Sequence, residues 1–524
     1  MQVLLIVKNA KNHKKRILKL FEGSDILKYK FYYDESEHSR TIGYKTITSE
    51  NFYDNFITVI VGWKSDKENE IQDKYCKFEQ KYIDRHPKGE LKSNTIQNKQ
   101  LQYGFASTVK GNIEFIDDFL SLFSDDIYIY ISTFSKIEYI VNQLFKGYQN
   151  SLLFDMDMMR YSIIKSLVIY KPSELVDAIY NNPQNIVATI KTFFKDRIEK
   201  NKSEPSLKQS ETKSFEQILL LLDDVDPIDH VEWDYTPPFV GFHRYLNEKS
   251  ISDYSLTIDR EGEHQKTVLA ARKANLKNVD DEESDNHFGI RMADMLAGMF
   301  GKLMKSLCKN LHPTNPDLVQ KTIIPTEWFD LSDAQLTLYK KLHYIVCELN
   351  NAWYKSFAGV YADDLVCINA LLNFMNHFKN TEEIKANLNM QGEYFNAFAC
   401  RSLSEDYRKK QSKLTIEPIQ STDLKKDYFF NQRGAKVYYD SDKQPLLLIS
   451  NGKVKHKVLA VGFDKKMNPL ITIEEQGIPV CYKLPKQLTD WAITVVSFAN
   501  MGGNPFPSDV LFTKRKGSYY ADIL

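Results

Sequence analysis

The chain has 524 residues, enough for about three domains, and its 43% hydrophobic and 26% charged residues exclude a disordered or fibrous protein. Its 69 Lys and Arg residues balance 69 Asp and Glu residues, which argues against a wholly basic nucleic-acid coat. The six cysteines are scattered without a C-x-x-C pair, so the sequence predicts reduced thiols and no zinc site. No cleavable signal pattern and no apolar run of about 18 residues is found, and we expect a soluble cytoplasmic protein with no membrane partner.

The first 135 residues predict a sheet with helices, and the most informative strand is aromatic. Residues 28–33 read Lys-Tyr-Lys-Phe-Tyr-Tyr and run directly into Asp34, Glu35 and Ser36. Asp is depleted inside strands, so Asp34 indicates either a turn or a functional carboxylate. Further strands are predicted at residues 2–8, 41–48, 56–63, 89–93 (short, or a sheet edge) and 127–131, and helices at 12–21, 66–85 and 113–123.

The middle of the chain has mostly helical patterns. Residues 136–197 and 215–222 are predicted to be helical, whereas the polar residues 199–213 predict an exposed linker. After them we expect a strand at 254–259, an acidic loop at 280–285, a strong helix at 289–303 and helices over 331–378. Short β-like runs beyond residue 414 predict a separate β-rich domain.

Two carboxylates end predicted strands on the more polar face of each strand. Alternate side chains of a strand point to opposite faces, so Asp34 shares a face with Ser36 while Glu35 points the other way. Asp259 ends its strand on the side that carries the hydroxyl residues. The alternation therefore favours Asp34 over Glu35 as a ligand beside Asp259.

A third acid, Asp294, lies on the predicted helix at residues 289–303. Its neighbours at helical spacing are Ile290, Ala297, Gly298 and Gly301, three of which are small. Gly costs about 1 kcal/mol in a helix relative to Ala, so two of them indicate close packing against a sheet. Such packing would deliver the carboxylate to the strand ends. The alternative is a core helix in which Asp294 only forms hydrogen bonds.

Short acidic motifs also occur in a recognisable order along the chain. They are Asp34-Glu35-Ser36, Glu90-Leu91-Lys92, Leu256-Thr257-Ile258-Asp259, and Ser284-Asp285 followed by Ile290-Arg291-Met292-Ala293-Asp294. This order resembles a bacterial RNase H-like family, the domain-of-unknown-function 3800 family, with its early D-E-S-G, its E-L-K and its late Q-L-A-D-like helix. Glu37 stands where the family has Gly, and Arg291 where it has an amide-like residue.

The resemblance implies an α/β fold with an RNase H-like mixed sheet flanked by helices. A helical insertion, a helical segment and a C-terminal β-rich domain would complete the chain. We expect the RNase H-like domain at residues 1–310 with the insertion at about 136–222, the helical region at 311–412 and the β-rich domain at 413–524.

The resemblance also implies a metal-dependent nuclease site. The catalytic acids that would bind Mg²⁺ or Mn²⁺ are Asp34, Glu90, Asp259 and Asp294, with Asp285 at their flank. Two such ions about 4 Å apart activate a water and stabilise the leaving oxygen in phosphodiester cleavage. Lys92 and Arg291 would contact the substrate, although Lys92 is equally suited to a salt bridge with Glu90. The expected substrate is a nucleic acid, DNA or RNA, and the family suggests a role in bacterial anti-phage defence.

A phosphatase is an alternative interpretation. Residues 152–157, Leu-Leu-Phe-Asp-Met-Asp, resemble the D-x-D start of haloacid-dehalogenase-like phosphatases, and Asp223-Asp224 resembles their late acidic pair. In that chemistry Asp155 would attack phosphorus and Asp157 would act as acid and base. The surrounding residues have a helical pattern rather than the expected strand pattern.

A third interpretation is a catalytically inactive platform that binds nucleic acid or protein. The β-rich tail carries bases and aromatics that would suit a nucleic-acid strand or a protein partner. They are Tyr438, Tyr439, Lys453, Lys455, Lys457, Lys514, Arg515, Lys516, Tyr519 and Tyr520. The alternative for such scattered residues is a solvated face.

Overall fold

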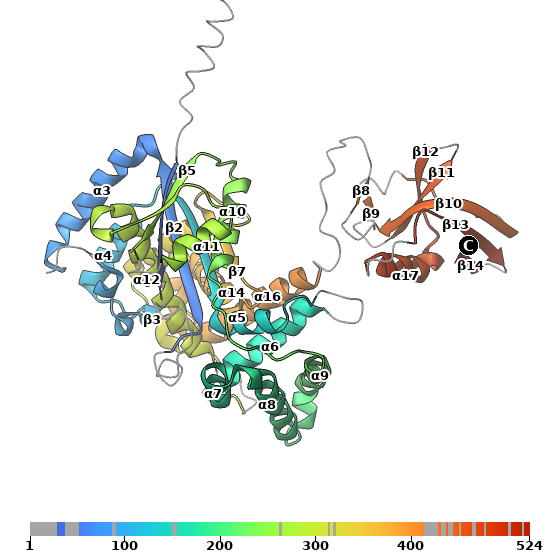
Figure 1. Ribbon diagram of the computed structural model, residues 1–524. Helices are drawn as coiled ribbons and strands as arrows, with labels where there is room; N and C mark the ends of the chain where they lie inside the picture. The colour runs from blue at the N-terminus through green and yellow to red at the C-terminus, as the bar shows by residue number, and fades with distance from the viewer. Residues whose placement is uncertain are drawn as a thin grey trace, which may run out of the picture. The chain divides into compact units, whose positions relative to one another are not determined.

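The computed structural model describes residues 29–36, 52–85, 91–148, 155–260, 265–312, 315–317, 321–412, 428–430, 436–438, 444–449, 452–463, 468–475, 478–500, 505–515 and 518–524 (Figure 1). The chain divides into two compact units. The first comprises residues up to 145 and 163–403, and the second residues 146–162 and 404–524. The strands expected at 2–8 and 41–48 and the helix expected at 12–21 lie outside the described residues.

The first unit is built on a mixed sheet of six strands. In spatial order they are β6 (Val279–Glu282), β5 (Tyr254–Asp259), β1 (Tyr29–Ser36), β2 (Asn55–Lys64), β4 (Tyr128–Ser135) and β7 (Ser356–Ala358). Strand β2 is antiparallel to both of its neighbours, and the other adjacent pairs are parallel. The strands predicted at 56–63, 127–131 and 254–259 are confirmed as β2, β4 and β5.

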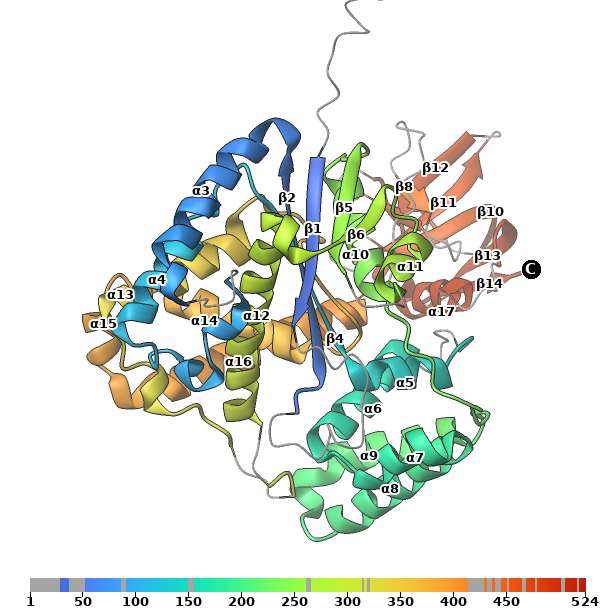
Figure 2. The same ribbon diagram turned by 60° about the vertical axis from the view of Figure 1, so that its left-hand side comes forward.

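Helices cover both faces of this sheet (Figure 2). Tyr32 of β1 packs in a core with α3 (Glu68–Lys81), α4 (Lys110–Leu120) and α12 (Phe288–Leu311). Phe31 and Tyr33 pack on the opposite face with α10 (Thr236–Glu248) and α11 (Lys266–Lys273). Strand β1 is therefore central in the sheet and buried on both faces. Aromatic and β-branched residues favour such buried strand positions. The helices predicted at 66–85, 113–123 and 289–303 correspond to α3, α4 and α12.

The described residues between 136 and 222 are mostly helical, but the linker predicted at 199–213 is wrong. Its helices are α5 (Lys136–Leu144), α6 (Met156–Tyr170), α7 (Ser173–Asn181), α8 (Ile186–Asn201) and α9 (Pro205–Leu222). Pro205 starts α9 at a position that tolerates proline, and Phe215 packs on Phe194 of α8. The polar residues before Phe215 are mostly adequate helix formers on an exposed face, so polarity alone did not indicate a linker.

Two short strands fall where the sequence predicts other structure. The acidic loop expected at 280–285 begins as β6, whose Asp281 pairs with Ile258 of β5. The helical pattern at 331–378 is interrupted between α13 (Asp333–His343) and α14 (Asp363–Asn376) by β7, whose Ser356 pairs with Ile131 of β4. Strands of three or four residues are too short to show periodicity. Strand β7 joins the sheet, and residues 311–403 are grouped with the first unit.

The second unit contains a separate, mostly antiparallel sheet with a helix packed on it. Its strands are β12 (Ile478–Lys483), β11 (Pro469–Glu475), β10 (Gly452–Phe463), β13 (Ser508–Arg515) and β14 (Ser518–Ile523), in spatial order, with β9 (Lys436–Tyr438) also pairing with β10 and with β8 (Tyr428–Phe430). Val458, Ile471 and Phe512 form its core with Ala492 of α17 (Thr489–Asn500). Two further described helices, α15 (Thr381–Lys385) and α16 (Gln391–Ser412), follow α14 along the chain. No helix in the described ranges is long and apolar enough to cross a membrane.

Candidate functional site

Two of the predicted acids lie side by side at the ends of adjacent parallel strands. The register of β1 and β5 pairs Tyr33 with Ile258, so the next residues along the two strands are Asp34 and Asp259. Paired residues of parallel neighbours point to the same face of a sheet. The topology therefore brings together two carboxylates that are 225 positions apart in the sequence.

The side chain of Asp34 lies on the face of β1 that α12 covers. Glu35 lies on the other face, where its Oε2 accepts a 2.7 Å hydrogen bond from the Tyr33 hydroxyl. Asp34 is buried, with 8% of its surface exposed, and its Oδ1 accepts a 2.6 Å hydrogen bond from the Glu35 backbone N–H. The alternation predicted from the sequence is thus observed.

Helix α12 passes very close to β1 because its contact face is glycine. A Cβ on Gly289 would lie 2.3 Å from the Tyr32 ring, and one on Gly301 would lie 2.7 Å from Ser36 Oγ. Asp294 lies between these two close contacts on the same helix. The small residues that the sequence places around Asp294 therefore do bring this helix against the strand that carries Asp34.

Asp294 is held by Ser93, which sequence reasoning did not identify. Ser93 donates from its backbone N–H to Asp294 Oδ2 and from its hydroxyl to Oδ1, both at 2.8 Å. Ser93 starts a 3-10 turn (Ser93–Thr95) where the sequence predicted a short strand or sheet edge. Its only sequence signal is its position directly after the Glu90-Leu91-Lys92 motif, of which Glu90 lies outside the described residues.

The charges of Asp259 and Asp294 affect the pKa of Asp34. Burial raises the pKa of Asp34 well above its usual range, and the nearby charges of Asp294 and Asp259 raise it further. The hydrogen bond from the Glu35 N–H opposes this only in part. Like charges gathered in a low-dielectric site favour either a bound proton or a bound cation. Asp34, Asp259 and Asp294 thus form one cluster, which we call the acid cluster.

The acid cluster has suitable donors for Mg²⁺ or Mn²⁺ but is not a complete ligand set. These ions prefer carboxylate oxygens, which all three residues supply. Among the described residues, however, no three or more His, Cys, Asp or Glu side chains are arranged to hold a metal ion. The fourth predicted ligand, Glu90, precedes Leu91 outside the described range, so its position relative to the cluster is not described.

Arg291 is held by residues of this chain, and its contact with substrate stays a prediction. Its Nε and Nη2 donate to the two carboxylate oxygens of Glu79 on α3 at 2.8 and 2.9 Å. Its Nη1 donates to the carbonyls of Ser284 at 2.8 Å and Asp285 at 3.2 Å, and the guanidinium lies over the Tyr75 ring. Such a bidentate, stacked arginine joins α3 to α12.

The other two candidates are exposed. The Asp285 side chain lies on a 3-10 turn (Ser284–Asn286) just before α12, and the Lys92 side chain lies just before Ser93. Their roles as flanking ligand and substrate contact stay predictions.

The acids of the phosphatase interpretation lie in or beside helices in the part of the chain that the structure describes. Asp155 Oδ1 accepts from the Met158 N–H at 3.0 Å at the start of α6, and Asp157 pairs with Arg160 in the first turn. Asp223 follows the end of α9 and pairs with Lys191 at 3.0 Å. The described contacts of these acids are thus contacts at helix ends, and the phosphatase chemistry stays an alternative prediction.

Comparisons of the chain with protein-family models, curated proteins and solved structures found no match. The candidate site therefore rests on its own geometry.

The raised pKa of Asp34 predicts a stabilising amide substitution. In metal-free protein the folded state binds a proton that the unfolded state has released, so the free energy of unfolding falls as pH rises above 3.8 toward the folded pKa. Asp34→Asn removes this decline and keeps the Oδ1 acceptor. We expect the variant to exceed wild type at pH 8 by on the order of 1–3 kcal/mol and to match it near pH 4. Urea denaturation in EDTA at the two pH values measures this, and a variant less stable at pH 8 would contradict it.

Proposed function

We propose that the protein is a divalent-metal-dependent nuclease with an RNase H-like catalytic unit. The observation that carries the proposal is the convergence of three buried or half-buried carboxylates from β1, β5 and α12. A mixed sheet whose central strand carries the first acid, with a late helix packed across that strand, agrees with the RNase H-like arrangement that the motifs imply. Glu90, next to the segment that holds Asp294, completes the proposed set.

The chain's own residues have distinct roles in this proposal. Asp34 and Asp259 present carboxylates from neighbouring strands, where the sheet fixes their spacing. Asp294 approaches from α12 and is oriented by the two hydrogen bonds from Ser93. When Mg²⁺ or Mn²⁺ is bound, it supplies an activated water and neutralises charge on the scissile phosphate. A role in defence against phage would follow from the family resemblance alone.

The test is a cleavage assay with the full chain. End-labelled single- and double-stranded RNA and DNA are incubated with Mn²⁺, with Mg²⁺, or with EDTA. We expect products with at least one metal and none with EDTA. Products that persist in EDTA, or no product from any substrate with either metal, would overturn the proposal.

A second candidate is a non-catalytic platform that binds nucleic acid. The observation that favours it is the absence of a complete metal-ligand group within the described ranges. This function predicts binding that is unchanged by EDTA together with no cleavage under any condition, so the same substrates distinguish the two candidates.

A further inference from the structure

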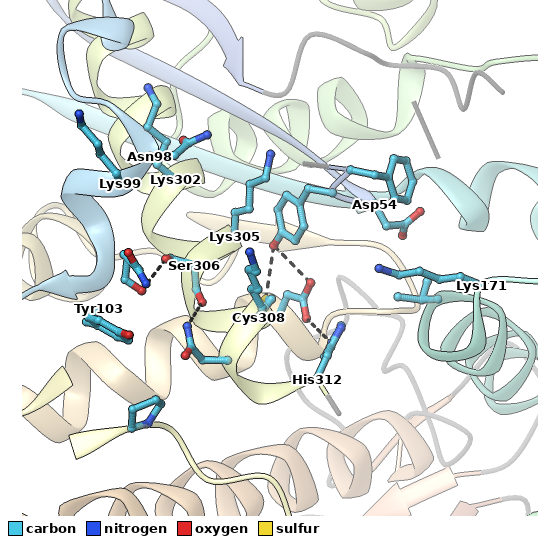
Figure 3. Close-up of a pocket in the computed structure, with 18 residues that line it drawn as sticks. Asp54, Asn98, Lys99, Tyr103, Lys171, Lys302, Lys305, Ser306, Cys308 and His312 are labelled. Atoms are coloured by element: carbon cyan, nitrogen blue, oxygen red, sulfur yellow. Dashed lines mark hydrogen bonds and ion pairs between the residues drawn. The ribbon is translucent and has the colours of Figure 1, made fainter. Parts of the chain in front are cut away.

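The first unit contains a cavity of about 670 Å³ beside the C-terminal half of α12 (Figure 3). This volume is in the range of ligand-binding pockets. Its walls come from α12, from residues 98–103 and from residues 52–54 before β2. The cationic side chains that line it are Lys99, Lys171, Lys302, Lys305 and Lys309, and His312 also lines it. We call it the lysine cavity.

The two carboxylates that line the lysine cavity, Asp54 and Asp364, are buried in its wall. Asp364 is 4% exposed and accepts hydrogen bonds from the Tyr53 hydroxyl at 3.2 Å and from Asn55. Asp54 is 5% exposed, and its Oδ1 accepts from the Ile137 N–H at 3.2 Å. The five lysines that line the cavity outnumber these two carboxylates, so the lining has a net positive charge.

Three of the lysines have no ion-pair partner in the described part of the chain. Lys99, Lys171 and Lys309 are exposed, and no described carboxylate lies within 4.0 Å of their ammonium groups. Like charges around one concave surface raise its potential and attract a polyanion. The cavity is thus suited to phosphate groups.

The lysine cavity is connected to the acid cluster through α12 and Ser93. Lys302 donates to the Ser93 carbonyl at 2.7 Å, and Ser93 holds Asp294. At 1.5 Å rise and 3.6 residues per turn, Lys302 and Lys309 lie about 12 and 22 Å beyond Asp294 and within roughly 80° of its direction around the helix. Each strand of a duplex has one phosphate per about 3.4 Å of helix axis, so distances of about 12 and 22 Å along that axis correspond to about three to seven nucleotides.

We propose that the lysine cavity binds the phosphate backbone of the substrate strand a few nucleotides from the acid cluster. The inference rests on the proposed nuclease function for the position of the scissile bond, and on the cavity itself for the binding. Phe52 and Tyr103 line the same cavity, and aromatic rings stack on bases. A strand held by its phosphates here would extend along α12 toward Asp294.

The test removes two exposed lysines while leaving Lys302 and its hydrogen bond intact. In full-length protein carrying Asp34→Asn, the double substitution Lys99→Gln and Lys309→Gln is compared with Lys110→Gln and Lys195→Gln, exposed lysines of the same unit outside the cavity. Binding of a fluorescent 12-nucleotide single strand and of a dinucleotide is measured by anisotropy in EDTA. The cavity pair is expected to weaken 12-mer binding about tenfold and to reduce the slope of log K against log salt by about 1.4.

The expected pattern is specific to the cavity and to strand length. The dinucleotide has a single internucleotide phosphate and can engage at most one of the two lysines at a time, so its affinity should fall much less than that of the 12-mer. Equal losses in the cavity and control pairs, or no loss in either, would overturn the inference. If ATP displaces the 12-mer when the two are present at the same concentration, the cavity binds a free nucleotide and the inference is overturned. If binding depends on the cavity lysines but the wild type cleaves no substrate, the inference is retained and the nuclease proposal is removed. If the wild type cleaves but binding does not depend on these lysines, the nuclease proposal is retained and the inference is removed.

Discussion

Asp34→Asn is expected to reduce metal-dependent cleavage by at least about 10³-fold, because it removes one charge from the proposed ligand set. The substitution preserves the size of the side chain and the Oδ1 atom that accepts from the Glu35 N–H. Burial and the charges of the other two acids raise the pKa of Asp34, so its charged form depends on a compensating cation. Initial rates on labelled RNA and DNA with Mn²⁺ measure the effect.

Glu35→Gln is the matched control for this substitution. It makes the same chemical change one residue further along β1, on the face that packs against α10 and α11. Its amide oxygen can still accept from Tyr33, and its backbone N–H still donates to Asp34, so we expect cleavage within about threefold of wild type. Equal cleavage by wild type and Asp34→Asn, or equal losses in the two variants, would remove Asp34 from the catalytic site.

Gly298→Ala is expected to lower both stability and cleavage. Its Cβ would lie 2.1 Å from Ser93 Cβ, so either Ser93 or α12 must move. Overpacking of this kind costs about 1–3 kcal/mol, which exceeds the helix-propensity gain of about 1 kcal/mol. Because Ser93 orients Asp294, we also expect cleavage to fall about 10- to 100-fold, as for other residues that position a ligand. Thermal melts and cleavage rates measure the two effects.

Gly111→Ala provides the control for the helix-propensity gain. Gly111 is also helical, but its added Cβ would meet nothing nearer than Arg85 Nη2 at 3.5 Å. We expect it to be neutral or to stabilise by up to about 1 kcal/mol. Adding Ser93→Gly to Gly298→Ala removes the clash, so the double variant should lose less stability than the sum of the single changes. Additive losses, or a Gly298→Ala variant as stable as wild type, would contradict this packing.

Local patterns predicted the central parts of the first unit. The period-two alternation of β1 separates Asp34 from Glu35, and the small residues around Asp294 predict the close approach of α12 to the sheet. Both predictions use residues that are close together in one strand or one helix. Over such short distances the backbone geometry of the element decides in which direction a side chain points. The same reasoning failed for α9, because exposed helices carry little periodic signal.

The amino-acid sequence alone predicted the central elements of the first unit, namely β1, β2, β4, β5, α3, α4 and α12, and the opposite faces of Asp34 and Glu35. Other features depend on contacts between distant segments. Strands β6 and β7 join the sheet in this way. Ser93 likewise holds Asp294 from 201 residues away, and Glu79 binds Arg291 across 212 residues. The lysine cavity also appears only when α12 is packed beside residues 52–54 and 98–103. The physical reason is that these contacts join segments with no shared periodicity, so their partners are selected by packing of the whole unit rather than by local backbone preference.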